Sequence, residues 1–139
     1  MADVFSPEKR SEIMSHIRSK GTQAERLAFS YLRKNKIYFQ KHYRRAPGTP
    51  DIALPRKKRA VFIDSEFWHG KDYERITRTR EPDNYWVKKI ARNMERDRET
   101  RKILVDRGWR VLVVWERDIK RKRTQNEVLE TIKKFLEAE

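Results

Sequence analysis

Apolar residues recur along this chain with two different spacings, and the changes between them predict the order of helices and strands. Residues 6–21 and 22–36 each carry apolar positions three and four residues apart, which is the spacing of a helix packed on one face. The second segment begins with Thr22 three residues before Glu25, a capping-box spacing that is typical of a helix start. Two helices are therefore expected before any strand.

Three short strands are expected next. Residues 37–43 form the first, and a tight Pro/Gly turn over residues 47–50 leads into the second, which starts at Asp51. The run Val61–Ile63 is apolar, largely β-branched and followed by charge, as in a buried strand that ends at Asp64.

The second half of the chain predicts a helix, a strand and a helix. A long helix starts at residue 83 or 84 and ends at Gly108, and the apolar run Trp109–Trp115 is the clearest strand. Capping-box spacing from Thr124 to Glu127 indicates the last helix. Its core-facing residues are expected to be Val128, Leu129, Ile132, Phe135 and Leu136. This order predicts an α/β fold with a central mixed sheet flanked by helices, the long helix being the crossover to the last strand.

Acidic side chains stand at the ends of two neighbouring predicted strands. Asp51 and Asp64 would lie close together there, with His69 just beyond them, and such a group can form a metal site with a base beside it. The other two histidines, His16 and His42, lack carboxylate or aromatic neighbours and are expected at the surface.

The charge of the chain suggests what such a site would act on. Lys and Arg total 35 against 21 Asp and Glu, a formal net charge of +14, which favours a polyanion such as nucleic acid. A charge-rich surface of the thermophile type is the structural alternative. The absence of cysteine excludes disulfides and thiolate metal sites. No signal peptide or long apolar helix is apparent, so a cytoplasmic protein without a membrane partner is expected. Metal-assisted cleavage of a phosphodiester is therefore the predicted chemistry.

Beyond these features, the chain resembles the very-short-patch repair endonucleases, a branch of the PD-(D/E)-x-K nuclease superfamily. The motifs that carry the resemblance are Met14 and Ile17, Glu25, Pro47-Gly48-Thr49-Pro50-Asp51, Phe67-Trp68-His69, Trp86, Asn93, Glu95-Arg96-Asp97, and Gly108 to Glu116. The resemblance implies one restriction-endonuclease-like domain over residues 1–139. It also implies a magnesium-dependent enzyme that nicks one DNA strand at a T:G mismatch and leaves a 5′-phosphate.

The resemblance also assigns roles to residues. Asp51 and the backbone carbonyl of Ile63 would hold the metal, His69 would be the general base, Asp97 would orient it, and Glu25 would assist at the metal. Asp64, at a position where the family varies, is kept as a catalytic candidate on the strand-end argument. The DNA-binding residues implied are the aromatic wedge Phe67, Trp68 and Trp86, the N-terminal helix residues Met14 and Ile17 within residues 1–20, and Lys89 and Asn93 at the mispaired bases.

Two of these residues have simpler alternatives. Glu25 could serve only as the third residue of the capping box, and Asp97 could merely pair with Arg101 one turn later.

The chain also departs from the family at a structural zinc site. Many members hold zinc with cysteines and histidine, where this chain has Glu66, Lys71, Tyr73 and Arg117. No zinc is expected here, and an ion pair of Glu66 with Arg117 or Lys71 is expected to hold the loop instead.

The sequence thus predicts a nucleoid-associated, monomeric endonuclease acting on double-stranded, mismatched DNA. Two alternatives stay open: a related nuclease without mismatch selectivity, and a basic DNA-binding module without catalysis. The flanking-base preference is not predicted.

Overall fold

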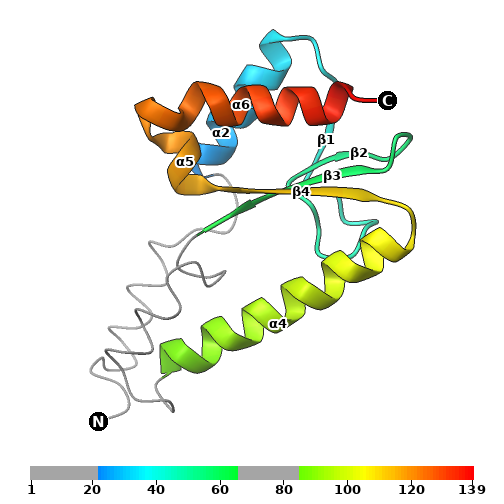
Figure 1. The fold of residues 1–139 in the computed structure, drawn as a ribbon, viewed down its shortest axis with the longest axis vertical. Helices are drawn as coiled ribbons and strands as arrows, with labels where there is room; N and C mark the ends of the chain where they lie inside the picture. Colours follow the sequence, from blue (N-terminus) through cyan, green and yellow to red (C-terminus); the bar gives the residue numbers. More distant parts are fainter. Residues whose placement is uncertain (1–21, 66–84) are drawn as a thin grey trace.

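A computed structural model of the chain describes residues 22–65 and 85–139, which form a four-stranded mixed sheet with helices over both faces (Figure 1). In chain order the elements are α2 (Gln23–Lys34), β1 (Gln40–Lys41), β2 (Ile52–Leu54), β3 (Arg59–Asp64), α4 (Tyr85–Asp106), β4 (Arg110–Trp115), α5 (Glu116–Lys120) and α6 (Lys122–Glu137). This architecture confirms the predicted α/β class and the mixed sheet flanked by helices.

The order of the strands brings the two predicted acidic positions to one end of the sheet. The strands follow the order β1-β2-β3-β4; the first three are antiparallel, and β4 runs parallel to β3. Because β2 runs against β3, the start of β2 at Ile52 lies opposite Val61, near the end of β3. Asp51 and Asp64 are therefore neighbours, as the strand-end argument expected.

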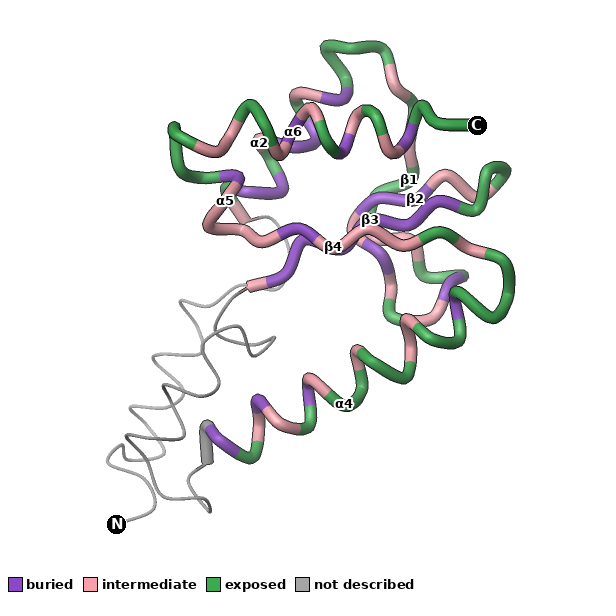
Figure 2. Tube along the Cα trace, viewed as in Figure 1, coloured by how far each residue is buried: buried purple, intermediate pink, exposed green. Residues whose placement is uncertain are grey.

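The central strand β3 is buried on both faces, which explains its continuous apolar run (Figure 2). Val61 and Ile63 pack into the core beneath α2, α5 and α6. Ala60 and Phe62 alternate with them and pack with Leu104 of α4 on the other face. The sheet thus separates two hydrophobic cores, and among the described helices Figure 1 shows only α4 on its side of the sheet.

Basic residues in the β2–β3 turn and at the start of β3 hold the end of the last helix. Lys57 Nζ donates to the backbone oxygen of Leu136 at 3.0 Å, and Arg59 Nη2 donates to that of Ala138 at 2.9 Å. Cations at the C-terminus of a helix satisfy its free carbonyls and complement its dipole. Part of the positive charge of the chain therefore has a structural role.

The helix starts and stops were predicted with mixed success. Thr22 caps α2 as expected, because its Oγ1 accepts the N–H of Glu25 at 3.2 Å. Gly108, with φ of +88°, follows the end of α4 as expected. The predicted start of the last helix at Thr124 is wrong: α6 begins at Lys122, and Thr124 Oγ1 donates to the backbone oxygen of Asp118 at 2.6 Å.

Two further differences concern the extent of elements. The strand expected over residues 37–43 is limited to Gln40–Lys41, because its partner β2 has only three residues. The short helix α5 was not expected. The helix expected over residues 6–21 lies outside the described residues. In the part of the chain that is described, no helix is both long and apolar enough to cross a bilayer.

Candidate metal centre and active site

Asp51 directly precedes β2 and is held in place from two sides. The preceding turn places Gly48 at φ +79°, where an added Cβ would come within 3.1 Å of Thr100 Oγ1 and 3.2 Å of the Phe62 ring. This turn therefore packs tightly against α4 and β3. On the other side, the N–H of Ile63 donates to Asp51 Oδ2 at 2.7 Å. The carboxylate is thus held against the backbone of Ile63, the residue expected to share the metal.

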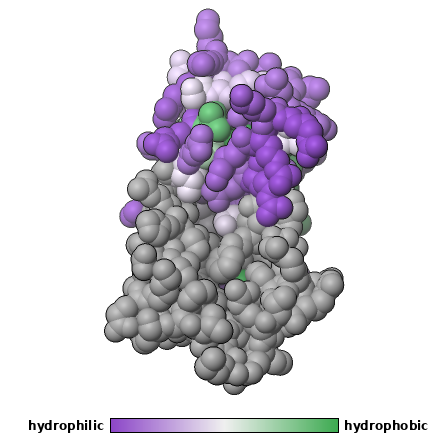
Figure 3. Space-filling model, turned by 90° about the vertical axis from the view of Figure 1, so that its left-hand side faces the viewer, coloured by the Kyte–Doolittle hydropathy of each residue, from purple (hydrophilic) through white to green (hydrophobic). Residues whose placement is uncertain are grey.

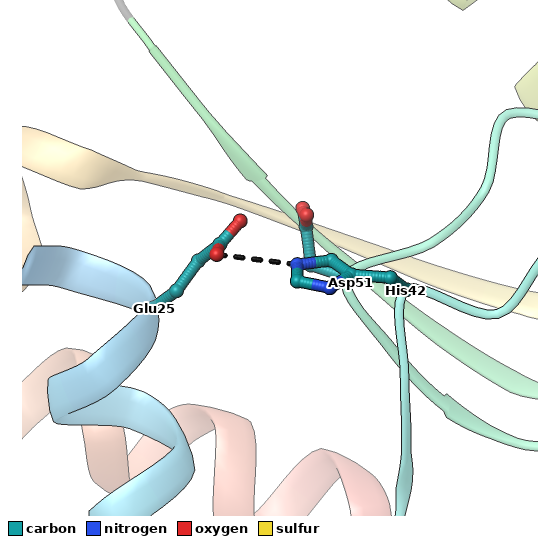
Figure 4. A group of neighbouring side chains, drawn as sticks. All are labelled: Glu25, His42 and Asp51. Atoms are coloured by element: carbon teal, nitrogen blue, oxygen red, sulfur yellow. Dashed lines mark hydrogen bonds and ion pairs between the residues drawn. The ribbon is translucent and has the colours of Figure 1, made fainter. Parts of the chain in front are cut away.

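Three side chains from different elements converge at this point (Figure 4). Glu25 comes from the first turn of α2, His42 from the residue after β1, and Asp51 from the start of β2. One potential ligand atom of each lies within 4.8 Å of the other two. Glu25 is only 2% exposed, and its Oε2 lies 3.2 Å from Nε2 of His42. Glu25 therefore does more than occupy a capping-box position.

His42 was expected at the surface without acidic or aromatic company, and this prediction is wrong. Its side chain is 20% exposed, pairs with Glu25, and meets the ring of Phe29 edge-on at 5.8 Å between centroids. The backbone N–H of His42 donates to the carbonyl oxygen of Asp51 at 3.0 Å, continuing the pairing of β1 with β2.

The sequence contains a pattern that could have placed His42 beside Asp51. Two predicted strands separated by a Pro/Gly turn are typical of a hairpin, and pairing them antiparallel places His42 opposite Asp51.

The electrostatics of the group favour a bound cation. The pKa of Asp51 is raised from an ordinary value of 3.8 to about 8. Burial is the largest cause, the charge and hydrogen bond of Glu25 add to it, and the Ile63 N–H acts in the opposite direction. A divalent cation stabilises two carboxylates that are held close together away from water. Carboxylate oxygens are also the ligands that Mg²⁺ and Mn²⁺ prefer. The residues present therefore fit a divalent metal centre.

Asp64 lies at the same end of the sheet but has a different partner. Arg101 Nη2 of α4 donates to both its oxygens, at 2.8 and 2.7 Å, and the Arg101 guanidinium also lies 4.6 Å from the centre of the Phe62 ring. Asp64 is 2% exposed, so this pair is almost fully removed from water on the carboxylate side. Arg101, considered above as a partner for Asp97, pairs instead with Asp64.

The α4 residues expected to serve the site share one face of that helix. Asn93, Asp97 and Arg101 are four residues apart, and the contact of Arg101 with Asp64 turns this face toward the end of β3. Asn93 is buried and accepts a hydrogen bond from Arg96 at 3.3 Å. Asp97 and Lys89 are half-buried.

The remaining predicted site residues are not placed. Trp86 belongs to the first turn of α4, but its side chain is not described. The other residues with predicted DNA-binding, catalytic or loop-holding roles lie outside the described residues: Met14, Ile17, Glu66, Phe67, Trp68, His69, Lys71 and Tyr73. Their roles stay predictions, as does the ion pair of Glu66 with Arg117 or Lys71.

Comparison with known proteins identifies the relatives of this fold and site. The family model described as DNA mismatch endonuclease Vsr matches residues 2–75. The chain is similar to the type II nicking enzyme V.HpaIIP of Haemophilus parainfluenzae, with 37% identity over 119 residues that cover 84% of each chain. It is also similar to the DNA mismatch endonuclease Vsr of Escherichia coli K12, with 33% identity over 116 residues, covering 84% of this chain and 74% of the relative. The type II nicking enzyme V.NaeI of Lentzea aerocolonigenes is 41% identical over 115 residues, which cover 78% of this chain and 68% of that enzyme.

Proposed function

Since the chain belongs to the Vsr family and is a DNA endonuclease, we propose that it nicks one strand of duplex DNA at a T:G mismatch and leaves a 5′-phosphate. The observation that carries the proposal is the buried acidic pair of Glu25 and Asp51 at the sheet end, beside the backbone of Ile63. A module that only binds DNA has no need of two carboxylates held together away from water. This geometry favours catalysis over simple binding.

Glu25, Asp51 and the backbone carbonyl of Ile63 are the groups that would hold the metal, which we propose to be Mg²⁺. When bound, this ion offsets the negative charge that develops on the phosphate during cleavage. The raised pKa of Asp51 means that the carboxylate gives up a proton when it becomes a ligand.

Proton transfer is assigned to His69 and Asp97. His69 would take a proton from the attacking water, since an imidazole accepts a proton near neutral pH. Asp97 would accept a hydrogen bond from the same imidazole and fix its orientation. Asp97 is half-buried on the face of α4 that turns toward the end of β3, which supports this role.

Recognition of the mismatch is assigned to three aromatic and two polar side chains. Phe67, Trp68 and Trp86 would enter the base stack, where unstacking costs least at a mispair. Lys89 and Asn93 would contact the mispaired bases. Replacing Trp68 with alanine is expected to lower cleavage of mismatched DNA without altering metal binding.

Double-stranded DNA as partner is supported by a hydrophilic face and by exposed basic residues. Figure 3 shows hydrophilic side chains gathered over the upper part of one face, where α2, α5 and α6 lie in Figure 1. Four consecutive basic residues at the α5–α6 junction, Lys120 to Arg123, are all exposed. Such residues hold phosphates and set the register of a protein on DNA without reading sequence. We propose that the protein binds DNA as a monomer.

A second candidate function is nicking without mismatch selectivity. It is favoured by the names of several relatives, which are called type II nicking enzymes without mention of a mismatch. The acidic site would be the same, and only the choice of DNA would differ.

Cleavage of three end-labelled duplexes separates these functions. Matched, T:G-mismatched and otherwise mispaired duplexes are incubated with the enzyme and Mg²⁺, and the nick and its 5′-phosphate are identified. We expect cleavage of the T:G duplex, no cleavage in a chelator, and a loss of several orders of magnitude in Asp51→Asn. The exposed carboxylate Asp106 supplies the matched control, Asp106→Asn. Equal cleavage of all duplexes would reject the mismatch function, and binding without any cleavage would reject the enzyme.

A further inference from the structure

The position of His42 extends the metal centre beyond the acidic pair. We propose that Nε2 of His42 is a metal ligand beside Glu25 and Asp51, and that the centre therefore binds Mn²⁺ more tightly than Mg²⁺. This inference rests on the proposed metal-dependent function and deepens it. It concerns which residues hold the metal and which ion they prefer.

The spacing of the three groups fits a common metal ion. Nitrogen and oxygen ligands lie about 2.0–2.2 Å from ions of this size, so two ligands at right angles are about 3 Å apart. The 3.2 Å between His42 Nε2 and Glu25 Oε2 is close to that separation. The 4.8 Å within which the ligand atoms of all three residues lie is only slightly more than two opposite ligands would span. A metal ion could thus replace the hydrogen bond between His42 and Glu25 with little movement.

The fold holds His42 in place without the metal. Its backbone N–H is bonded to the carbonyl of Asp51, and its ring packs edge-on against Phe29. Its φ of +48° is a left-handed conformation that few residues other than glycine adopt, and it directs the chain out of β1 into the turn. The imidazole is therefore tied to the same backbone that carries Asp51, so both ligands are positioned together.

An imidazole ligand changes which ion the site prefers. Mg²⁺ takes oxygen ligands almost exclusively and keeps several of its waters, whereas transition metals accept imidazole nitrogen readily. Two carboxylates alone would discriminate little between Mg²⁺ and Mn²⁺. The added nitrogen favours Mn²⁺, so the preference between the two ions measures the contribution of His42.

Substitutions at residue 42 separate ligation from a purely structural role. Glutamine can still donate a hydrogen bond to Glu25, but it offers an amide oxygen in place of the imidazole nitrogen. His42→Gln should therefore keep the fold and Mg²⁺ binding while losing the preference for Mn²⁺. The exposed neutral residue Gln40 on β1, two residues before His42, provides the control, Gln40→Ala.

The test is a titration of the metal-free full-length protein with Mn²⁺, followed by electron paramagnetic resonance, with Mg²⁺ affinity measured by competition. We expect His42→Ala and His42→Gln to weaken Mn²⁺ binding about tenfold or more, with less than about a threefold change for Mg²⁺. We also expect an imidazole-nitrogen hyperfine coupling to bound Mn²⁺ in the wild type and in Gln40→Ala that is absent in His42→Gln. Circular dichroism confirms that each variant is folded.

The outcomes distinguish this inference from the proposed function. Unchanged Mn²⁺ affinity and hyperfine coupling in folded His42→Gln would overturn the inference, even if the protein nicks T:G duplexes normally. Mn²⁺ binding through His42 in a protein that cleaves none of the duplexes would leave the inference standing and reject the proposed nuclease.

Discussion

The raised pKa of Asp51 predicts that replacing this residue with asparagine changes how the metal-free protein responds to pH. Asparagine keeps the shape of the side chain and an oxygen that can accept the Ile63 N–H, but it carries no charge. In the folded wild type the Asp51 pKa is about 8, against an ordinary value of 3.8. Between these values the folded protein holds a proton that the unfolded chain releases, so the free energy of unfolding falls as pH rises.

The size of this effect follows from linkage. One proton of difference lowers the free energy of unfolding by about 1.4 kcal/mol for each pH unit. The interval from about pH 5 to about pH 7 lies between the two pKa values, so Asp51 is protonated in the folded protein and ionised in the unfolded chain throughout it. Over these two pH units Asp51 should lower the free energy of unfolding of the wild type by about 2.7 kcal/mol. Asp51→Asn lacks this contribution. Its free energy of unfolding should therefore rise by the same amount relative to that of the wild type over the same pH interval.

Urea unfolding in chelator at pH 5, 6 and 7, followed by circular dichroism, measures the difference. Comparing variants at each pH removes the contributions of groups that titrate in both proteins. Asp106→Asn changes an exposed carboxylate that pairs with Lys102 one turn away on the same helix. Its free energy of unfolding should change with pH in the same way as that of the wild type. If Asp51→Asn also ran parallel to the wild type, the buried carboxylate would be ionised throughout, and the electrostatic argument for the metal centre would be refuted.

Three further predictions test the structure and the DNA partner. Arg101→Gln should lower the free energy of unfolding by about 3–5 kcal/mol because it leaves Asp64 charged and buried, whereas adding Asp64→Asn should recover much of the loss in the same urea experiment. Thr22→Ala should cost about 1 kcal/mol by removing the cap of α2, and an unchanged unfolding midpoint would refute that role. If about eight phosphates are neutralised, the logarithm of the DNA association constant should fall with the logarithm of salt at a slope near −7, and a slope near zero would mean that the charge serves only solubility.

The elements with strong local signals were predictable from the sequence. The run Val61–Ile63 is apolar because β3 is an inner strand that is buried along its whole length. The strand ending at Trp115 is apolar after Arg110, which also marks it as a strand, although it is mostly half-buried. The stop of α4 at Gly108 follows from a backbone conformation that favours glycine. In contrast, α5 is five residues long with Ile119 as its only buried residue, so it has no apolar repeat to reveal it.

The sequence predicts the parts of the site that follow from the ends of strands. It does not predict contacts between side chains of elements that are distant in the sequence. Asp51 and Asp64 were expected to be neighbours because each adjoins a predicted strand. That Asp64 pairs with Arg101 depends on how α4 crosses the sheet, which involves residues 37 positions apart. Local spacing offered Asp97 only as an alternative partner of Arg101, and the structure pairs Arg101 with Asp64.

The division of the site between two parts of the chain has a consequence for how such enzymes diversify. The groups of the metal centre all lie between Glu25 and Ile63, on α2 and on strands joined by hairpins. Asn93, Asp97 and Arg101 come from α4, which covers the opposite face of the sheet. Under the roles proposed above, substitutions of Lys89 and Asn93 on α4 change contacts to the bases without displacing any metal ligand, so a lineage can change the DNA it selects while inheriting the same metal centre.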